Sequence, residues 1–122
     1  MGKKSPQSLP RSFACAFSGI AQGFGQRNMR IHLVVAVLAI IACAVLRCTA
    51  VEWAIVLVLI GLVIAAELFN TAIEAAIDLA SPDIHPLAKR GKDIAAGAVL
   101  VLAITAVVVG LLIYIGAFMR LF

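Results

Sequence analysis

The chain alternates long uncharged runs with shorter polar segments, and three runs stand out: residues 33–46, 53–66 and 94–119. A helix needs about 20 residues to cross the hydrocarbon core of a bilayer, so the third run is long enough alone and the first two need flanking polar residues. A helix continued from the second run is stopped at Ser81-Pro82. We therefore predict three membrane-spanning helices, over about residues 31–47, 52–79 and 93–119.

The segment before the first span has a different pattern. Apolar side chains recur there at spacings of four, three and four residues, at Phe13, Phe17, Ile20 and Phe24. This periodicity is typical of an amphipathic helix, and nearby basic residues favour a helix on the membrane surface. Packing against the cytoplasmic ends of the spans is the alternative. We predict an all-α membrane protein with a cytoplasmic N-terminus and surface helix in residues 1–30 and a three-span domain in residues 31–122.

Composition supports a membrane protein, because 64% of the 122 residues are hydrophobic and 13% are charged. A water-facing domain carries roughly a quarter charged residues, so a soluble globular domain is excluded. The three cysteines lack the spacing of a metal site, which favours a role as small apolar fillers. The net charge of +4 does not indicate a nucleic-acid partner, because the basic residues flank apolar runs and have few aromatic residues among them.

The basic residues predict the orientation of the spans, since cytoplasmic loops collect Lys and Arg. Eight of the ten Lys and Arg fall on one side of the predicted spans: Lys3, Lys4, Arg11, Arg27, Arg30, Lys89, Arg90 and Lys92. Arg47 and Arg120 fall on the other side. We therefore place the N-terminus and the loop between the second and third spans in the cytoplasm. Trp53 and Tyr114 then lie near the opposite interface, where aromatic rings prefer to sit.

Candidate chemistry is concentrated at the cytoplasmic end of the second span. At about 100° per residue, one stripe of that helix carries Glu67, Asn70, Glu74 and Asp78. Ionisable groups at membrane depth cost at least ~2.5 kcal/mol each, so a row of three carboxylates indicates a function that uses cations. Glu74 and Asp78, nearer the headgroups, are candidate ligands for Mg²⁺. Glu67, the deepest of the three, suits a general base that takes a proton from an alcohol.

A second polar cluster follows directly on the cytoplasmic side, in residues 83–93. Its cations, Lys89, Arg90 and Lys92, are suited to hold a polyphosphate whose metal ion the carboxylates bind. Ordinary positive-inside charge is the alternative, and a lone His85 supports little by itself. The sequence contains neither of the common glycine-rich loops that hold nucleotide phosphates in soluble proteins. Spacing therefore leaves both interpretations of the cluster open.

Three stretches carry a family resemblance: residues 67–74 (ELFNTAIE), 85–89 (HPLAK) and 92–99 (KDIAAGAV). Together with Asp78, they closely resemble the small integral-membrane lipid kinases of the prokaryotic diacylglycerol kinase family. The resemblance extends from about Phe13 to Arg120. The HPLAK form is more similar to the undecaprenol kinase branch, known from Gram-positive bacteria, than to the diacylglycerol kinase branch of enteric bacteria.

The resemblance implies a homotrimer in the bacterial cytoplasmic membrane, with active sites between subunits where a membrane lipid alcohol meets ATP and its Mg²⁺ cofactor. By motif position, Glu67 would be the catalytic base and Glu74 a ligand of the metal and the nucleotide. Further nucleotide contacts would be Asp83, Ile84, His85, Lys92 and Asp93. The lipid substrate would be bordered by Asn28, Arg30, His32, Glu67 and Asn70.

One position departs from the family pattern. Members commonly carry a metal-binding Glu shortly before the Asn that corresponds to Asn28, and here that position is Gln26. An amide oxygen can bind Mg²⁺ but contributes no negative charge, so Gln26 is the weaker candidate ligand. Asp78 or Asp93 would then substitute for the missing carboxylate.

We therefore predict an ATP- and Mg²⁺-dependent lipid kinase, with undecaprenol as the preferred substrate and diacylglycerol as the second. The alternative from another class is a small oligomeric proton- or cation-conducting protein that uses Glu67. That function leaves the cationic cluster of residues 83–93 without a role. A structural membrane adaptor is the third interpretation.

Overall fold

The computed structural model describes residues 8–122, and this part of the chain is all-helical, as predicted. Four helices follow one another along the chain: α1 (Leu9–Phe24), α2 (Arg27–Val45), α3 (Ala50–Ala80) and α4 (Pro86–Leu121). Lys3 and Lys4, which were counted among the cytoplasmic cations, lie outside the described residues.

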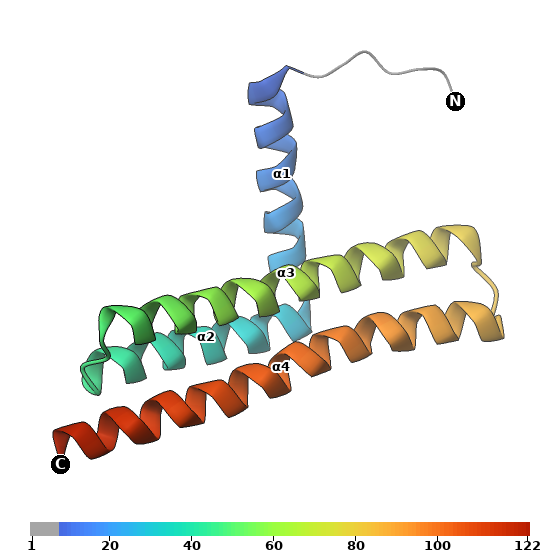
Figure 1. Cartoon of the computed structure of the whole chain (residues 1–122). Helices are drawn as coiled ribbons and strands as arrows, with labels where there is room; N and C mark the ends of the chain where they lie inside the picture. The colour runs from blue at the N-terminus through green and yellow to red at the C-terminus, as the bar shows by residue number, and fades with distance from the viewer. Residues whose placement is uncertain (1–7) are drawn as a thin grey trace.

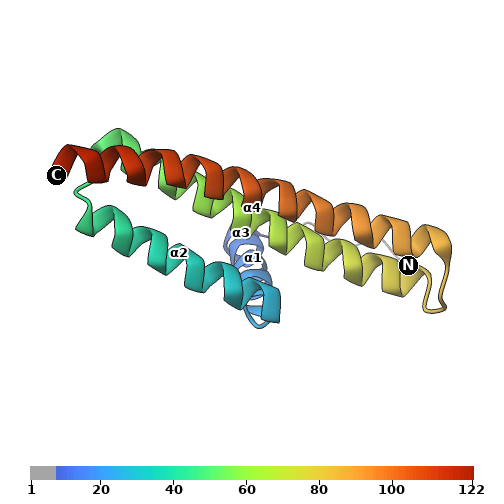
Figure 2. The ribbon, with the colours of Figure 1, turned by 90° about the horizontal axis from the view of Figure 1, so that it is seen from below.

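The three long helices run side by side, while α1 stands roughly perpendicular to them (Figure 1). Helix α3 packs against both α2 and α4, whereas α2 and α4 meet at few points. Seen from below, α2 lies to one side of the pair formed by α3 and α4 (Figure 2). The short turn between α2 and α3 and the C-terminus lie at one end of the bundle. We call the other end, where residues 81–85 join α3 to α4, the hairpin end.

All three long helices are apolar and long enough to cross a membrane. Many of their large apolar side chains are exposed, Leu112 and Val101 among them, which is the surface that lipid or a second subunit covers. Helix α3 has 31 residues and α4 has 36, so they are about 46 and 54 Å long at 1.5 Å per residue. Because the hydrocarbon core is about 30 Å thick, parts of both helices extend beyond it.

The last helix begins at Pro86, earlier than the span that we expected to start near residue 93. A proline is favoured in the first helical turn, and His85 caps the helix by accepting a hydrogen bond from the Leu87 N–H at 3.1 Å. The expected boundary was placed where charged residues give way to apolar ones. That change limits the membrane-crossing part of a helix, but charged residues can continue the same helix outside the membrane. Residues 86–93 are therefore the first turns of α4 rather than a loop.

Helix α1 contacts the bundle at its C-terminal end. Gly23 is buried, and a Cβ atom at that position would clash with the Leu68 side chain on α3. The rest of α1 projects away from the bundle, with Phe13 and Phe17 exposed. The helix predicted for this segment is confirmed, and its position on the membrane surface stays a prediction.

At the end opposite the hairpin, an ion pair ties α4 to α3. Arg120 donates to both carboxylate oxygens of Glu52, at 2.7 and 3.2 Å. Glu52 is also half of a capping box with Thr49, whose hydroxyl accepts from the Glu52 N–H at 3.2 Å. The turn before it places Arg47 in the left-handed region, with φ of 54°. These contacts fix the relative positions of α3 and α4 at the end remote from the carboxylate stripe.

Candidate active site

The predicted stripe of polar residues changes from buried to exposed along α3. Glu67 and Asn70 are only 3% and 4% exposed, whereas Glu74 and Asp78 are exposed. Glu67 is next to Leu68, where α1 meets the bundle, and Glu74 and Asp78 lie further toward the hairpin end. The contact with α1 therefore lies level with the buried pair, and the exposed pair lies beyond it toward the hairpin end.

Glu67 is paired with a side chain from another helix. The Nε2 atom of His32 on α2 lies 3.6 Å from Oε2 of Glu67. His32 was predicted to border the lipid substrate, and the structure brings it beside the predicted base. A buried carboxylate in contact with an imidazole is a suitable acceptor for the proton of a substrate hydroxyl.

Asn70 orients the next carboxylate along the stripe. Its Nδ2 donates to Oε1 of Glu74 at 3.2 Å. Its Oδ1 is buried and has no hydrogen-bond partner among the described residues. A buried unpaired acceptor is costly, so a site that keeps one is able to receive a donor such as a hydroxyl or a water molecule.

The first turns of α4 bring cations close to these carboxylates. The Nζ of Lys92 pairs with Oδ1 of Asp78 across the hairpin. Lys89 pairs with Asp93 along the helix, with Nζ and Oδ2 2.6 Å apart. The N-terminus of a helix also carries a partial positive charge and favours anions. Ionic groups of both signs therefore meet at the hairpin end.

The connection before α4 holds the remaining candidate nucleotide contacts. Asp83 and Ile84 are exposed, and the Asp83 carbonyl accepts a hydrogen bond from the Ser81 hydroxyl at 3.1 Å. His85 uses its Nδ1 atom to cap α4, so a ligand would meet its Nε2 atom. The structural role of His85 could have been anticipated from the proline that follows it.

Other predicted residues are not brought together within the chain. Gln26 precedes the first turn of α2 and is exposed, as are Asn28 and Arg30. In residues 8–122, no group of three or more His, Cys, Asp or Glu side chains is arranged to hold a metal ion.

Comparison with known proteins identifies the family to which the chain belongs. The profile of the family described as prokaryotic diacylglycerol kinase matches residues 14–114. The chain belongs to this family. As a member of the prokaryotic diacylglycerol kinase family it is a lipid kinase, and a membrane protein, which agrees with its three long apolar helices.

Similar curated proteins within the family carry two names. The undecaprenol kinase of Bacillus subtilis is 43% identical in an alignment of 112 residues that covers 86% of each chain. The diacylglycerol kinase of Synechocystis is 45% identical in an alignment of 101 residues that covers 81% of this chain but 58% of the relative. A Helicobacter pylori diacylglycerol kinase is 33% identical over 69 residues. These likenesses confirm the resemblance drawn from residues 67–99 and do not favour a conducting protein.

Proposed function

We propose that the protein transfers the γ-phosphoryl group of ATP to the hydroxyl group of a membrane lipid, with undecaprenol as the preferred acceptor and diacylglycerol as the second. The preference is supported by the undecaprenol kinase of B. subtilis, whose likeness covers most of both chains. The observation that carries the proposal is the stripe on α3, which joins a buried carboxylate beside an imidazole to exposed carboxylates near cations.

Glu67 acts as the base in the proposed reaction. It accepts the proton of the lipid hydroxyl as the hydroxyl oxygen forms a bond to the γ-phosphorus and the bond to the leaving ADP breaks. The contact with His32 holds the carboxylate in place. Asn70, with its free buried oxygen, accepts a hydrogen bond at the same level, and Asn28 and Arg30 border the lipid headgroup at the start of α2.

Glu74 is the proposed ligand of Mg²⁺ and helps to bind the nucleotide. The ion would neutralise charge on the phosphates. Asn70 holds one Glu74 oxygen, which orients the carboxylate toward its ligand. Gln26 is a weaker candidate because it contributes no charge, and Asp78 is a weaker one because it becomes available only when Lys92 leaves it.

The nucleotide is proposed to bind at the hairpin end. Lys92 contacts the phosphates there after exchanging its ion pair with Asp78 for one with a phosphate oxygen. The other proposed nucleotide contacts are Asp83, Ile84, His85 and Asp93. Catalysis then consists mainly of positioning, since the lipid supplies its own nucleophile.

The assembly and its orientation are also proposals. We propose a homotrimer in the bacterial cytoplasmic membrane, with the N-terminus and the hairpin end in the cytoplasm. The basic residues support this orientation, because Arg11, Arg27 and Arg30 lie near α1 and Lys89, Arg90 and Lys92 lie at the hairpin end. A trimer gives the exposed apolar faces a covering and can add side chains to a site that one chain leaves open.

The test is transfer of labelled phosphate from ATP into extracted lipid. The purified protein is mixed with undecaprenol or diacylglycerol in the same detergent, with Mg²⁺ or with a chelator. Mg²⁺-dependent label in the lipid phase, faster with undecaprenol, supports the proposal. Proton flux in liposomes without ATP consumption would instead favour a conducting protein.

A further inference from the structure

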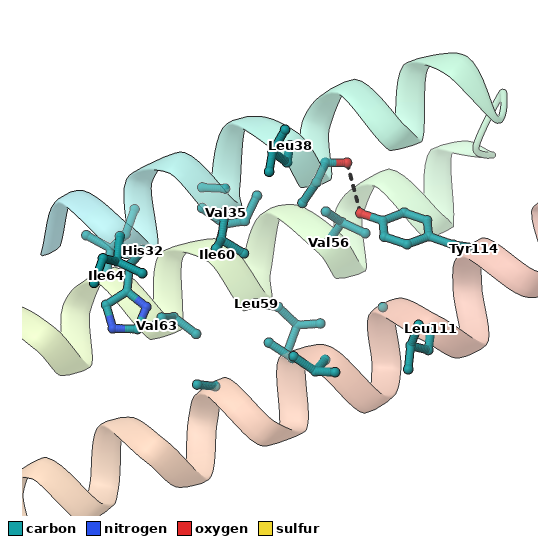
Figure 3. A pocket seen from close by; sticks show the side chains of 17 residues that line it. His32, Val35, Leu38, Val56, Leu59, Ile60, Val63, Ile64, Leu111 and Tyr114 are labelled. Carbon is teal, nitrogen blue, oxygen red and sulfur yellow. Dashed lines mark hydrogen bonds between the residues drawn. The ribbon is translucent and has the colours of Figure 1, made fainter. Parts of the chain in front are cut away.

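An apolar groove lies between α2 and α4, with α3 as its floor. Its volume is about 490 Å³, within the range of about 300–1,000 Å³ for small-molecule sites. Figure 3 shows aliphatic side chains from all three helices around it, Val35, Leu59, Val63 and Leu111 among them. The groove exists because α2 and α4 both pack on α3 but touch each other at few points.

The two ends of the groove have different chemistry. His32 lies at one end, and its imidazole is 3.6 Å from the Glu67 carboxylate. Tyr114 lies at the other end and donates its hydroxyl to the Ala39 carbonyl at 2.8 Å, which joins α4 to α2 (Figure 3). The far end therefore offers no free phenol hydrogen, and the polar end is the one whose lining residue His32 contacts the proposed base.

The groove and the base also share one face of α3. Val56, Ile60, Val63 and Glu67 follow one another at spacings of four, three and four residues, and the first three line the groove. At about 100° per residue these positions form one stripe along the helix. A molecule with a hydroxyl at Glu67 thus has a continuous apolar path for its hydrocarbon chain.

We propose that this groove holds the first isoprene units of a polyprenol substrate and is long enough for about three of them. The proposal rests on the proposed function, because it takes the hydroxyl at Glu67 as the starting point. From Ala103 to Tyr114, α4 rises about 16 Å at 1.5 Å per residue. An isoprene unit has four backbone carbon–carbon bonds of about 1.5 Å each and reaches about 5 Å when extended. The later units of a long polyprenol then remain in the bilayer.

The benefit of such a groove is orientation rather than hydrophobic burial. Bilayer lipid is as apolar as the groove, so a hydrocarbon chain gains little free energy when it moves from the bilayer into the groove. A chain held on one face of α3, however, directs its hydroxyl at Glu67 and lowers the entropy cost of reaching the reactive geometry. We therefore expect chain length to affect kcat/KM only until the groove is full.

The first experiment compares prenols of two, three, four and eleven isoprene units as acceptors, at equal mole fraction in mixed micelles. The expected result is a severalfold rise in kcat/KM up to the three- or four-unit alcohol and no further rise to the longest. A kcat/KM that keeps rising up to the longest prenol, or that is the same for all four prenols, overturns the proposal.

The second experiment shortens the groove from its far end. A Cβ atom at Gly110 would lie 3.7 Å from Cε2 of Tyr114, an ordinary contact, so Gly110→Leu can place its side chain in the groove. This variant should lose severalfold in kcat/KM for the four-unit alcohol relative to the two-unit alcohol. Gly116→Leu is the matched control, because Gly116 lies outside the groove and has open space around it. The control should keep the wild-type length profile, and an equal effect of both variants overturns the proposal.

A third measurement is independent of turnover. A three-unit prenol with a diazirine at its far end is photolysed with the protein, and the labelled residues are mapped by mass spectrometry. Labelling near Gly110, Leu111 and Tyr114 supports the proposal even where no phosphate is transferred, so a failed kinase assay remains distinguishable from a failed groove assignment. Labelling spread over the outer faces overturns it. A change of oligomeric state in Gly110→Leu, without labelling, would show instead that a second copy covers the groove.

Discussion

Glu67 is a buried carboxylate beside His32, and the proposed chemistry depends on its charge. We expect Glu67→Gln to reduce turnover by at least about 100-fold, since a positioned base contributes about 10²–10⁴ in rate. The amide has nearly the same shape, so the assembly should remain intact. Phosphate transfer and gel filtration of the same preparation measure the two effects. Near-normal turnover in a well-assembled variant would refute the role of Glu67 as base.

Glu74 is exposed and is held by Asn70 through one oxygen. Replacing it with Gln keeps an acceptor for that hydrogen bond and removes only the negative charge. We expect the KM for MgATP to rise by about tenfold or more, because interactions with a charged group contribute about 1.5–3 kcal/mol. Titrations of ATP and Mg²⁺ measure the effect. Glu52→Gln, the same change at the opposite end of α3, is the control and should leave this KM unchanged.

Helices α3 and α4 meet at the hairpin end through the pair of Asp78 and Lys92, whose side chains are 63% and 39% exposed. An ion pair this exposed adds at most about 1 kcal/mol to stability. We therefore expect Lys92→Met to raise the KM for ATP severalfold with little change in thermal stability. Asp78→Asn should leave the Mg²⁺ requirement as it is, because Glu74 is the proposed ligand. A higher Mg²⁺ requirement in Asp78→Asn would show that Asp78 binds the metal.

The elements could be predicted from the sequence to different degrees. The three apolar runs and the Phe13 to Phe24 periodicity identified all four helices, because hydropathy and helical period are local properties. The start of α4 was missed, since the predicted boundary followed polarity and overlooked the cap at His85. The hydrogen bond of Tyr114 with Ala39 joins residues 75 positions apart, and the pairing of Lys92 with Asp78 depends on the hairpin geometry. Such contacts require the packing of helices, which a single sequence does not encode locally.

The whole molecule is expected to expose one reactive thiol to water. Cys15 is exposed on the side of α1 away from Phe13 and Phe17, while Cys43 is buried. Cys48, in the turn between α2 and α3, has its pKa raised from 9.0 to about 12 by burial and by the neighbouring Cys43, so it stays protonated and unreactive at neutral pH. A membrane-impermeant maleimide should therefore label inside-out vesicles at one site, and Cys15→Ser should abolish labelling. Labelling of Cys15 in intact cells by the same reagent would show that the orientation is the opposite of the one proposed.

The close packing of Gly23 against Leu68 predicts that the protein responds to the thickness of the surrounding membrane. Because α1 packs against α3 at that level, we expect that it does not follow the lipid surface when acyl chains lengthen. A thicker bilayer would then submerge the carboxylates beyond Leu68, and a thinner one would expose Glu67 to water. Hydrophobic mismatch costs only fractions of a kcal/mol per Å, but it would act directly on the height at which ATP and the lipid hydroxyl must meet. The enzyme should thus have an optimal acyl-chain length among its host lipids, set by the position of a single glycine.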